Sequence, residues 1–365
     1  MIRTFLKLLV CAVLLIGVLR NIVVREDVIP AEKPDQSSTS TSQLSWISKE
    51  IKLVEQGALS LWGMMRIIPA QALVGSLGLM GFSIFLGALR WQIMLKHQGL
   101  NLPIIRVMEI SLVAQFFNSF LLGASGGDVM KAVYVSRETH QKKVEAVGTV
   151  MLDRVVGLLS MIAFAVLVVP FQLKLIGDSP LMSLTVALTS SILLLGLSTF
   201  FIPKLMPQST ERLIRLATSH KSSAIQQLGR ILAVLNGATH SPLLLVKTSI
   251  ISFLTNLLCV AQFWILSEAL NMRLRFTDLA LIVPLVVVIS AIPITPSGLG
   301  VREQLFVNLL SISAIGALQS KSLSLSLVAF GTTLVWSVIG GGVYLAFRDS
   351  HNLRNITEEE PPTNR

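Results

Sequence analysis

The chain has 365 residues, of which 52% are hydrophobic and 14% charged, and its formal net charge is +10. Soluble domains carry about 25% charged residues, so this composition excludes an ordinary soluble protein. Several runs of about 20 apolar residues predict an all-α polytopic integral membrane protein. The basic residues lie between these runs and form no basic–aromatic module, so they indicate the positive-inside bias and attraction to anionic lipids rather than nucleic-acid binding.

Cysteines and histidines give no sign of a metal site or a cofactor. Cys11 and Cys259 both lie in apolar runs, and the five histidines are scattered without helical pairing. Neither pattern matches a disulfide framework or a metal-ligand spacing. We therefore expect no metal and no cofactor.

The N-terminal part combines an apolar run with a polar segment. Residues 1–24 predict a first membrane span, because Arg3 and Lys7 precede the apolar run and no signal-cleavage pattern follows it. Residues 25–66 hold five basic and six acidic residues, which suits the non-cytoplasmic side, and an amphipathic helix is predicted within them over 46–65. Residues 67–348 form the predicted membrane core, and the polar tail 349–365 is predicted to be disordered and cytoplasmic.

Five further full spans are predicted in the core, at residues 67–89, 155–173, 181–202, 248–266 and 323–347. In the first of these, Gly75, Gly78, Gly81 and Gly87 are expected to allow close helix approach. Residues 204–247 hold six basic residues against Glu211 alone and should be cytoplasmic, with an amphipathic stretch over 210–235 lying on the inner leaflet. This charge pattern places both termini in the cytoplasm.

Residues 107–122 are apolar but too short for a comfortable span, and they include Glu109, Gln115 and Asn118. Basic residues flank the segment on both sides, which predicts a hairpin that dips into the membrane and returns on the same side. Non-helical backbone at membrane depth is tolerated where it is buried in protein or lines a wet cavity. The tip is predicted near residues 123–128. A plain short span followed by an unusual loop is the alternative.

A second interrupted stretch, residues 279–318, predicts a hairpin that enters from the opposite side. Pro284, Pro293 and Pro296 should break the apolar run, and Arg302 and Glu303 lie midway between its halves. Six full spans and two re-entrant hairpins of opposite orientation predict an inverted repeat with its site at the midplane.

Asp128 is the first candidate for contact with a ligand. It follows Gly126 and Gly127 and opens a helix predicted over 129–135. The two glycines should let backbone N–H groups point at an anion, assisted by the partial positive charge of the helix N-terminus. The alternative is that Asp128 is only a helix N-cap.

The second loop follows the same logic. Ser297 is expected to cap the helix that follows, and Gly298 and Gly300 to open the backbone. Arg302 carries a planar fork that suits a phosphate. Chain neighbours do not share a helix face, so Arg302 and Glu303 are each expected to need a separate partner or water. For Arg302 the options are Asp128, Glu303 or a lipid phosphate, and a purely structural buried ion pair is the alternative.

Four other polar residues need an interpretation. Asp153 fits a helix N-terminus, and its neighbour Arg154 is expected to face a cavity. Asn118 could bond a headgroup or satisfy backbone. Lys131 is interpreted as an interfacial cation, with recruitment of anionic lipid as the alternative. The predicted substrate-binding residues are Asn118, Gly126, Gly127, Asp128, Arg154, Ser297, Gly298, Gly300, Arg302 and Glu303.

Three motifs in order give the chain a family resemblance: Gly-Gly-Asp-x-x-Lys within residues 118–131, Asp-Arg-x-x-Gly at 153–157, and a Pro/Gly-rich loop ending in Arg-Glu at 293–303. Together they resemble the lysylphosphatidylglycerol synthase transmembrane, or flippase-like, family. The resemblance implies lipid translocation. It implies no synthesis of lysyl-lipid, because this chain shows no aminoacyltransferase domain, and it does not cover residues 25–66.

The leading hypothesis is a translocator in the inner membrane that moves an anionic or glycosylated lipid headgroup through a midplane cavity. The alternatives are a membrane-embedded transferase that uses Asp128 or Glu303 as a base, and a non-catalytic subunit of a lipid-modifying complex. Expected partners are a membrane lipid with an anionic headgroup, a separate lipid-modifying enzyme and further copies of the chain.

Overall fold

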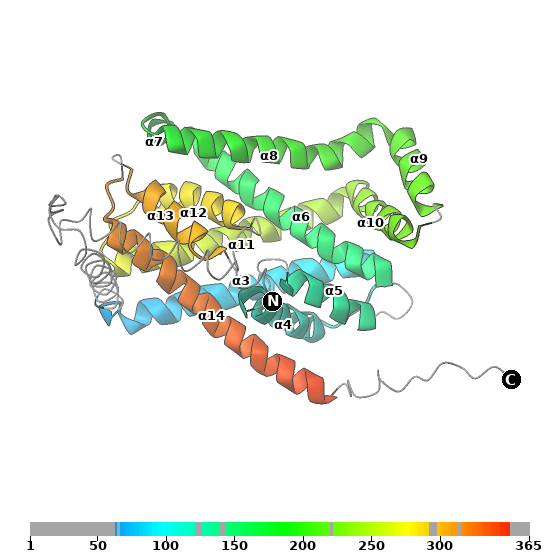
Figure 1. Ribbon diagram of the computed structural model, residues 1–365, viewed down its shortest axis with the longest axis horizontal. Helices are drawn as coiled ribbons and strands as arrows, with labels where there is room; N and C mark the ends of the chain where they lie inside the picture. The colour runs from blue at the N-terminus through cyan, green and yellow to red at the C-terminus, as the bar shows by residue number, and fades with distance from the viewer. Residues whose placement is uncertain are drawn as a thin grey trace, which may run out of the picture.

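The computed structural model describes residues 63, 66–120, 126–138, 143–219, 222–291, 298–312 and 315–350. The predicted first span, almost all of the segment 25–66, Ser297 and the tail beyond residue 350 lie outside these ranges. The regular elements within them are helices, which lie side by side in one elongated bundle (Figure 1). The prediction of an all-α architecture is confirmed.

Five helices are long and apolar enough to cross a membrane: α3 (Ala70–His97), α6 (Lys143–Val168), α8 (Pro180–Leu205), α11 (Pro242–Ala269) and α14 (Gln319–Ser350). They correspond to the five predicted spans of the core, so the chain is a multi-pass membrane protein. Leu184, Leu188 and Leu195 of α8 are exposed, as side chains that face lipid should be. Helix α6 begins well before the predicted start at residue 155 and therefore carries Asp153 and Arg154 in its interior.

Between α3 and α6 the chain forms a hairpin of two short helices, α4 (Ile104–Phe120) and α5 (Gly126–Glu138). Arg106 near the start of α4 forms an ion pair with Glu138 at the end of α5, with Nη2 and Oε1 2.7 Å apart. The two open ends of the hairpin therefore lie together, at the end of the bundle where α3 ends. This is the geometry predicted for a hairpin that enters and returns on one side.

Between α11 and α14 lies a second hairpin, formed by α12 (Phe276–Ser290) and α13 (Val301–Leu310). Lys321 at the start of α14 donates a hydrogen bond of 3.1 Å to the carbonyl of Asn271, which precedes α12. The open ends of this hairpin therefore lie at the opposite end of the bundle. Pro284 was expected to interrupt the run but lies inside α12, fully packed by neighbouring helices.

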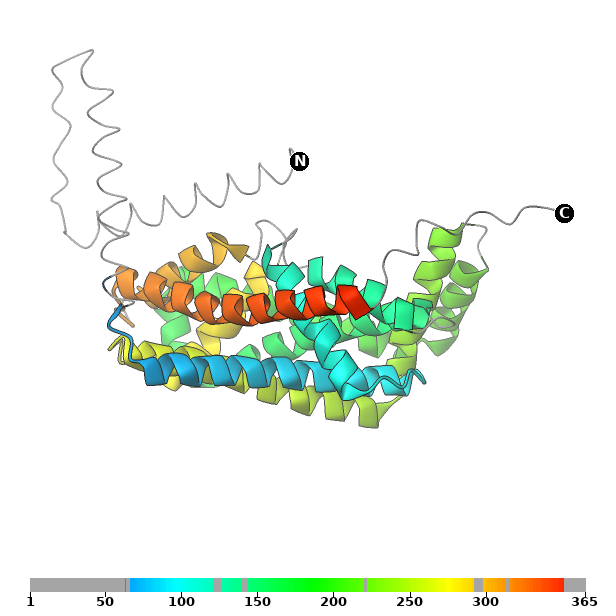
Figure 2. The ribbon, with the colours of Figure 1, turned by 90° about the horizontal axis from the view of Figure 1, so that it is seen from below.

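The helices form two units, α3–α6 and α11–α14, and each unit consists of a span, a hairpin and a second span. The two units run in opposite directions along the bundle. His97 at the end of α3 lies 3.1 Å from the hydroxyl of Ser241, the residue before α11, so these two spans run antiparallel. The packing is reciprocal: α3 lies against α11, α4 lies against α14, and α12 lies against α6. Figure 2 shows α3 and α14 running along the bundle together, with the α4–α5 hairpin beside them. The arrangement is that of an inverted repeat.

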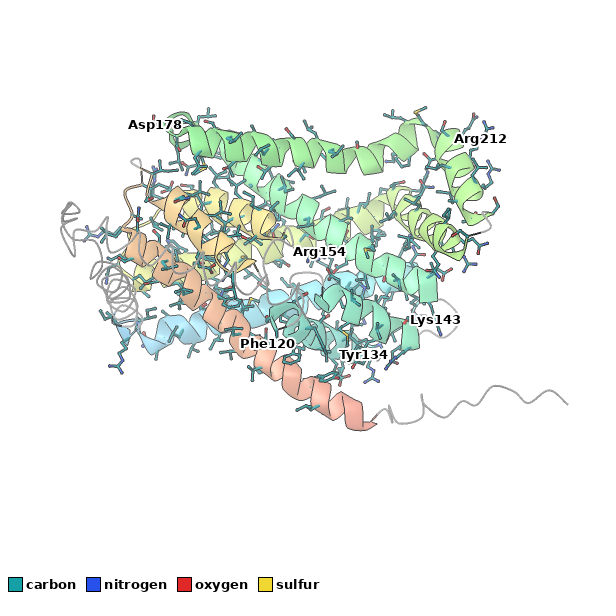
Figure 3. The ribbon with its side chains drawn as sticks, viewed as in Figure 1. Phe120, Tyr134, Lys143, Arg154, Asp178 and Arg212 are labelled. Atoms are coloured by element: carbon teal, nitrogen blue, oxygen red, sulfur yellow. The ribbon has the colours of Figure 1, made fainter. Side chains whose placement is uncertain are left out.

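The remaining helices connect the two units. Helix α6 leads through a 3-10 turn, η1 (Val169–Phe171), and α7 (Leu173–Gly177) into α8; α9 (Pro207–Thr218) and α10 (Ser223–Thr239) then precede α11. Lys143 and Arg212 lie at one end of the bundle and Asp178 at the other (Figure 3). We name these the basic end and the far end. Helix α9 buries no residue and exposes Leu213 and Leu216, in keeping with the predicted amphipathic stretch.

Glycines bring some of the helices into close contact, though fewer than expected. A Cβ on Gly81 would collide with the indole of Trp336, and one on Gly340 would collide with the Leu112 carbonyl. In contrast, a Cβ on Gly75, Gly78 or Gly87 would meet no atom within 4 Å. The prediction of close approach therefore holds at Gly81 and is wrong for the other three glycines of α3.

Candidate functional site

Two adjoining cavities lie inside the bundle. The first, of about 290 Å³, lies between α3, α4, α5 and α6, and the second, of about 300 Å³, lies mainly between α4, α11, α12 and α14. They share Gln115, Asn118 and Arg154 as wall residues. On α3 the second cavity is lined by Met80 and the first by residues between 84 and 90. Because α3 ends at the basic end, the cavities are stacked along the bundle, with the first nearer the basic end.

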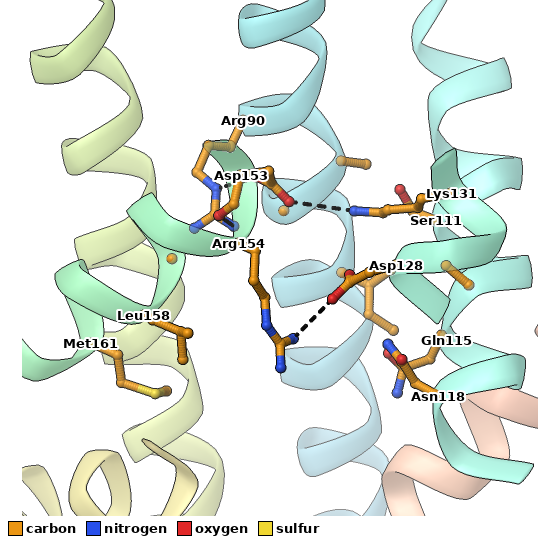
Figure 4. Close-up of a pocket in the computed structure, with 15 residues that line it drawn as sticks. Arg90, Ser111, Gln115, Asn118, Asp128, Lys131, Asp153, Arg154, Leu158 and Met161 are labelled. Atoms are coloured by element: carbon orange, nitrogen blue, oxygen red, sulfur yellow. Dashed lines mark hydrogen bonds and ion pairs between the residues drawn. The ribbon is translucent and has the colours of Figure 1, made fainter. Parts of the chain in front are cut away.

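Asp153 organises the cations of the first cavity (Figure 4). Its carboxylate accepts a hydrogen bond of 2.8 Å from Arg90 Nε and lies 3.4 Å from Lys131 Nζ. Arg90 also donates to the hydroxyl of Ser252, at 2.8 Å, and the Lys131 ammonium lies 4.6 Å from the ring centroid of Trp91. The interpretation of Asp153 as a residue at a helix N-terminus is wrong, because α6 begins ten residues earlier, at Lys143. Asp153 is instead the shared anion of two partly buried cations.

The contacts of α6 explain why the Asp-Arg-x-x-Gly motif ends in a glycine. Gly157 lies one helical turn after Asp153, on the same face of α6. A Cβ at Gly157 would lie 3.0 Å from Arg90 Nη2, so the glycine leaves room for the guanidinium that Asp153 holds. Arg154 was expected to face a cavity, and its side chain lines both.

Asp128 faces Arg154 across the first cavity, with Oδ2 and Nη1 3.5 Å apart (Figure 4). The side chain of Arg154 is 34% exposed, compared with 13% for both Arg90 and Lys131. Arg154 is therefore the most accessible cation of the site, and its ion pair is about as long as that of Lys131 with Asp153. Asp128 lies in the first turn of α5, not before it, so a simple N-cap does not describe its place.

The N-terminus of α5 is closed by protein groups. The backbone N–H of Gly127 donates a hydrogen bond of 2.8 Å to Asn118 Oδ1. A Cβ on Gly127 would collide with the carbonyl of Ala114 and with the Asn118 side chain. Of the two options for Asn118, the structure shows the bond to backbone. The expectation that Gly127 offers a free N–H to a ligand is wrong, whereas Gly126 is the first residue of the helix.

The second cavity has a different kind of charge pair. The carboxylate of Glu303 is fully buried and accepts hydrogen bonds from the Gly300 N–H at 2.6 Å and from the Ser326 hydroxyl at 3.3 Å. Arg302 also pairs with it, with Nε 3.0 Å from Oε1. The guanidinium of Arg302 packs 4.4 Å from the ring centroid of Phe330 and lines the cavity.

The expectation that Arg302 and Glu303 need separate partners is therefore wrong. Glu303 turns back over the start of α13 and accepts a hydrogen bond from the Gly300 N–H, which is the half of a capping box that a glycine N-cap allows. This turn brings its carboxylate beside the Arg302 fork. Asp128 is not the partner of Arg302, because it pairs with Arg154.

The glycines of the second loop adopt backbone conformations that other residues disfavour. Gly298 and Gly300 have φ angles of +70° and +82°, a region that favours glycine. A Cβ on Gly298 would lie 2.9 Å from that of Ser290. The Gly300 N–H binds Glu303, so it is not open to a ligand. Ser297 lies outside the described residues.

Three residues of the site were not predicted as such. Arg90 follows an apolar run and fits the pattern of an interfacial cation, and Lys131 follows a glycine-rich loop. Both are drawn into the protein by Asp153, whose position in the middle of α6 was not predicted. Gln115 lines both cavities beside Arg154 and was noted only as a polar residue in a short segment.

The fold and the site together define a multi-pass α-helical membrane protein with two opposed hairpins around a charged internal site. The chain belongs to the family described by the lysylphosphatidylglycerol synthase TM region, whose profile matches residues 58–341. It is also similar to the UPF0104 membrane protein PH1989 of Pyrococcus horikoshii, with 24% identity over 121 residues. That match covers 33% of this chain and 36% of the relative, so it spans about a third of either protein. The three motifs all lie inside residues 58–341.

Proposed function

We propose that this protein moves a lipid with an anionic headgroup, free or glycosylated, between the two leaflets of the membrane. The observation that carries the proposal is the position of Arg154 in the shared wall of two cavities stacked along the bundle. Membership in the family supports a lipid-related membrane function. The two stacked cavities supply a route for the headgroup, and Arg154 is a cation that lines both of them.

The physical problem for such a protein is the cost of placing a phosphate in hydrocarbon, where a charge at the centre of the bilayer is strongly disfavoured. Arginine presents a planar fork that matches phosphate oxygens. Arg90 and Arg302 already have close carboxylate partners, at 2.8 Å and 3.0 Å. Among the described residues Arg154 is held by one ion-pair contact, of 3.5 Å to Asp128, so it can turn toward a phosphate in either cavity while Asp128 remains near.

The predicted site residues divide into two groups under this proposal. Gly126, Asp128, Arg154 and Arg302 contact the headgroup, because they border the cavities or the start of α5. The other group holds these residues in place and comprises Asn118, Gly127, Gly298, Gly300 and Glu303. The acyl chains remain in the surrounding lipid.

The orientation follows from charge. Under the positive-inside rule the basic end, which carries Lys143, Arg212 and Arg215, faces the cytoplasm of a cell with an inner membrane. The first cavity then lies nearer the cytoplasmic leaflet and the second cavity nearer the opposite leaflet.

The test is lipid movement in proteoliposomes, measured by the loss of fluorescence when a membrane-impermeant quencher reduces labelled anionic lipid in the outer leaflet. We expect Arg154→Gln and Arg302→Ala to reduce the rate at least about tenfold, since each removes a cation that faces the route. Arg215→Gln, on exposed α9, is the matched control. Full activity of Arg154→Gln would contradict the proposal. Formation of a modified lipid in detergent, where no leaflets exist, would support a transferase instead.

A further inference from the structure

We infer that the site selects a headgroup that carries one net negative charge, a phosphodiester lipid whose remaining headgroup is uncharged. The inference rests on the proposed function, and it names the substrate class. It begins from the charges of the first cavity. Three cations, Arg90, Lys131 and Arg154, face two carboxylates, Asp128 and Asp153, which leaves a sum of +1.

The second cavity leaves this sum unchanged. Among the described residues the second cavity has one cation besides Arg154, which is Arg302. The buried carboxylate of Glu303 neutralises that cation. Within the described part of the chain, no other Asp, Glu, Lys or Arg lines either cavity. The combined route therefore carries one surplus positive charge along its length.

The surplus charge is most accessible at Arg154. Arg90 and Arg302 have close carboxylate partners and Lys131 lies 3.4 Å from Asp153, whereas Arg154 is the cation that is about one-third exposed and lines both cavities. An uncompensated charge in a poorly solvated site is costly, so the occupied site is most stable when the ligand brings its sum to zero. A headgroup of net charge −1 does so. A zwitterionic headgroup leaves +1, and a phosphomonoester added to a phosphodiester leaves about −2.

The neutral polar lining fits the uncharged remainder of such a headgroup. Gln115 lies in the shared wall, and among the described residues its side-chain amide makes no hydrogen bond. An amide offers both donors and an acceptor, which suits the hydroxyls of a glycerol or a sugar. An ammonium in the same place would meet the surplus positive charge instead.

The experiment compares three lipids with the same labelled acyl chain in proteoliposomes of the full chain. The probes are phosphatidylcholine, phosphatidylglycerol and a phosphatidylinositol phosphate. We expect phosphatidylglycerol to move at least about tenfold faster than the other two, because each of the others leaves an uncompensated charge. Equal rates, or a preference for phosphatidylcholine or for the phosphatidylinositol phosphate, would overturn the inference while leaving lipid translocation standing.

Charge variants separate net charge from headgroup size. Asp128→Asn raises the sum to +2 and should increase the rate of the phosphatidylinositol phosphate relative to phosphatidylglycerol at least about fivefold. Lys131→Gln lowers the sum to zero and should favour phosphatidylcholine by a similar factor. Glu211→Gln and Arg215→Gln make the same charge changes on exposed α9 and should leave all ratios unchanged. Ratios that do not move in the two cavity variants would overturn the inference.

A failure of translocation is distinguished by binding. If no lipid moves although the protein is folded, the proposed function fails, and the inference is judged on the lipid that copurifies with the chain. Retained lipid of net charge −1, exchanged for more highly charged lipid in Asp128→Asn, supports the selection. Retained lipid that is mainly zwitterionic overturns it.

Discussion

The two units of the repeat hold their arginine–carboxylate pairs in different ways. In the α3–α6 unit, Asp128 and Arg154 meet loosely across a cavity, and a second carboxylate, Asp153, holds two cations from the middle of a span. In the α11–α14 unit, Arg302 and Glu303 form a compact pair at the start of α13, with the carboxylate completely buried. One unit has a partly exposed arginine in a long ion pair, and the other has an arginine in a short ion pair with a buried carboxylate.

This difference suggests a division of labour within one inverted architecture. Asp128 and Glu303 occupy similar places, each in the first turn of the second helix of a hairpin. Glu303 closes its own helix through Gly300, whereas the start of α5 is closed by Asn118, which leaves Asp128 available to Arg154. Variants of the two units should separate the tightly paired charges from the loosely paired one.

The largest loss of stability is expected for Glu303→Gln. The substitution leaves Arg302 buried beside a neutral amide and weakens the cap of α13, which should lower the free energy of unfolding by about 3–5 kcal/mol. Thermal unfolding of the purified protein in detergent measures the effect, with Glu211→Gln as a control that should change little. An unchanged midpoint for Glu303→Gln would show that the pair does not hold α13 in place.

Arg90→Gln and Arg154→Gln should behave differently although each removes one arginine from the first cavity. Arg90 is bonded to Asp153 and Ser252, so its loss should cost about 2–3 kcal/mol. Arg154 has only a long ion pair, and its loss should cost about 0.5 kcal/mol or less. The same unfolding assay makes the comparison. Equal losses of stability in the two variants would contradict the distinction between a tightly held Arg90 and a loosely held Arg154.

Gly127→Ala should destabilise the protein by about 1–3 kcal/mol, because the new methyl group must displace α5 from the Ala114 carbonyl. Gly78→Ala is its matched control on an open helix face, where alanine should be neutral or stabilising by about 0.5–1 kcal/mol. Unfolding midpoints of the two variants test the pair. A Gly127→Ala protein as stable as wild type would mean that α4 and α5 are not in backbone contact there.

Asn118→Ala should have a local effect of about 1 kcal/mol, because the Gly127 N–H loses its acceptor while the surrounding packing stays in place. Hydrogen exchange of the amides at the start of α5 should accelerate, and exchange in α13 should not. Acceleration in both hairpins would indicate a general loosening of the bundle rather than a local cap.

Much of the architecture could be predicted because composition and charge control it directly. Apolar length predicted the five core spans, and basic residues on both flanks of 107–122 predicted the first hairpin. The site was harder, because its contacts depend on tertiary geometry. The closest partner of Asp153 is Arg90, from a helix far away in the sequence, and the pairing of Arg302 with Glu303 depends on the bond from the Gly300 N–H to Glu303, which helix spacing alone does not reveal.

The role of Arg154 in receiving the headgroup is tested by the amount of lipid that stays bound through purification. Native mass spectrometry measures this amount for wild type and Arg154→Gln. If Arg154 is the cation that receives the headgroup in both cavities, wild-type protein retains an anionic lipid, and Arg154→Gln, equally folded, loses at least about nine-tenths of it. Equal occupancy by the same anionic lipid in both proteins would contradict that role for Arg154.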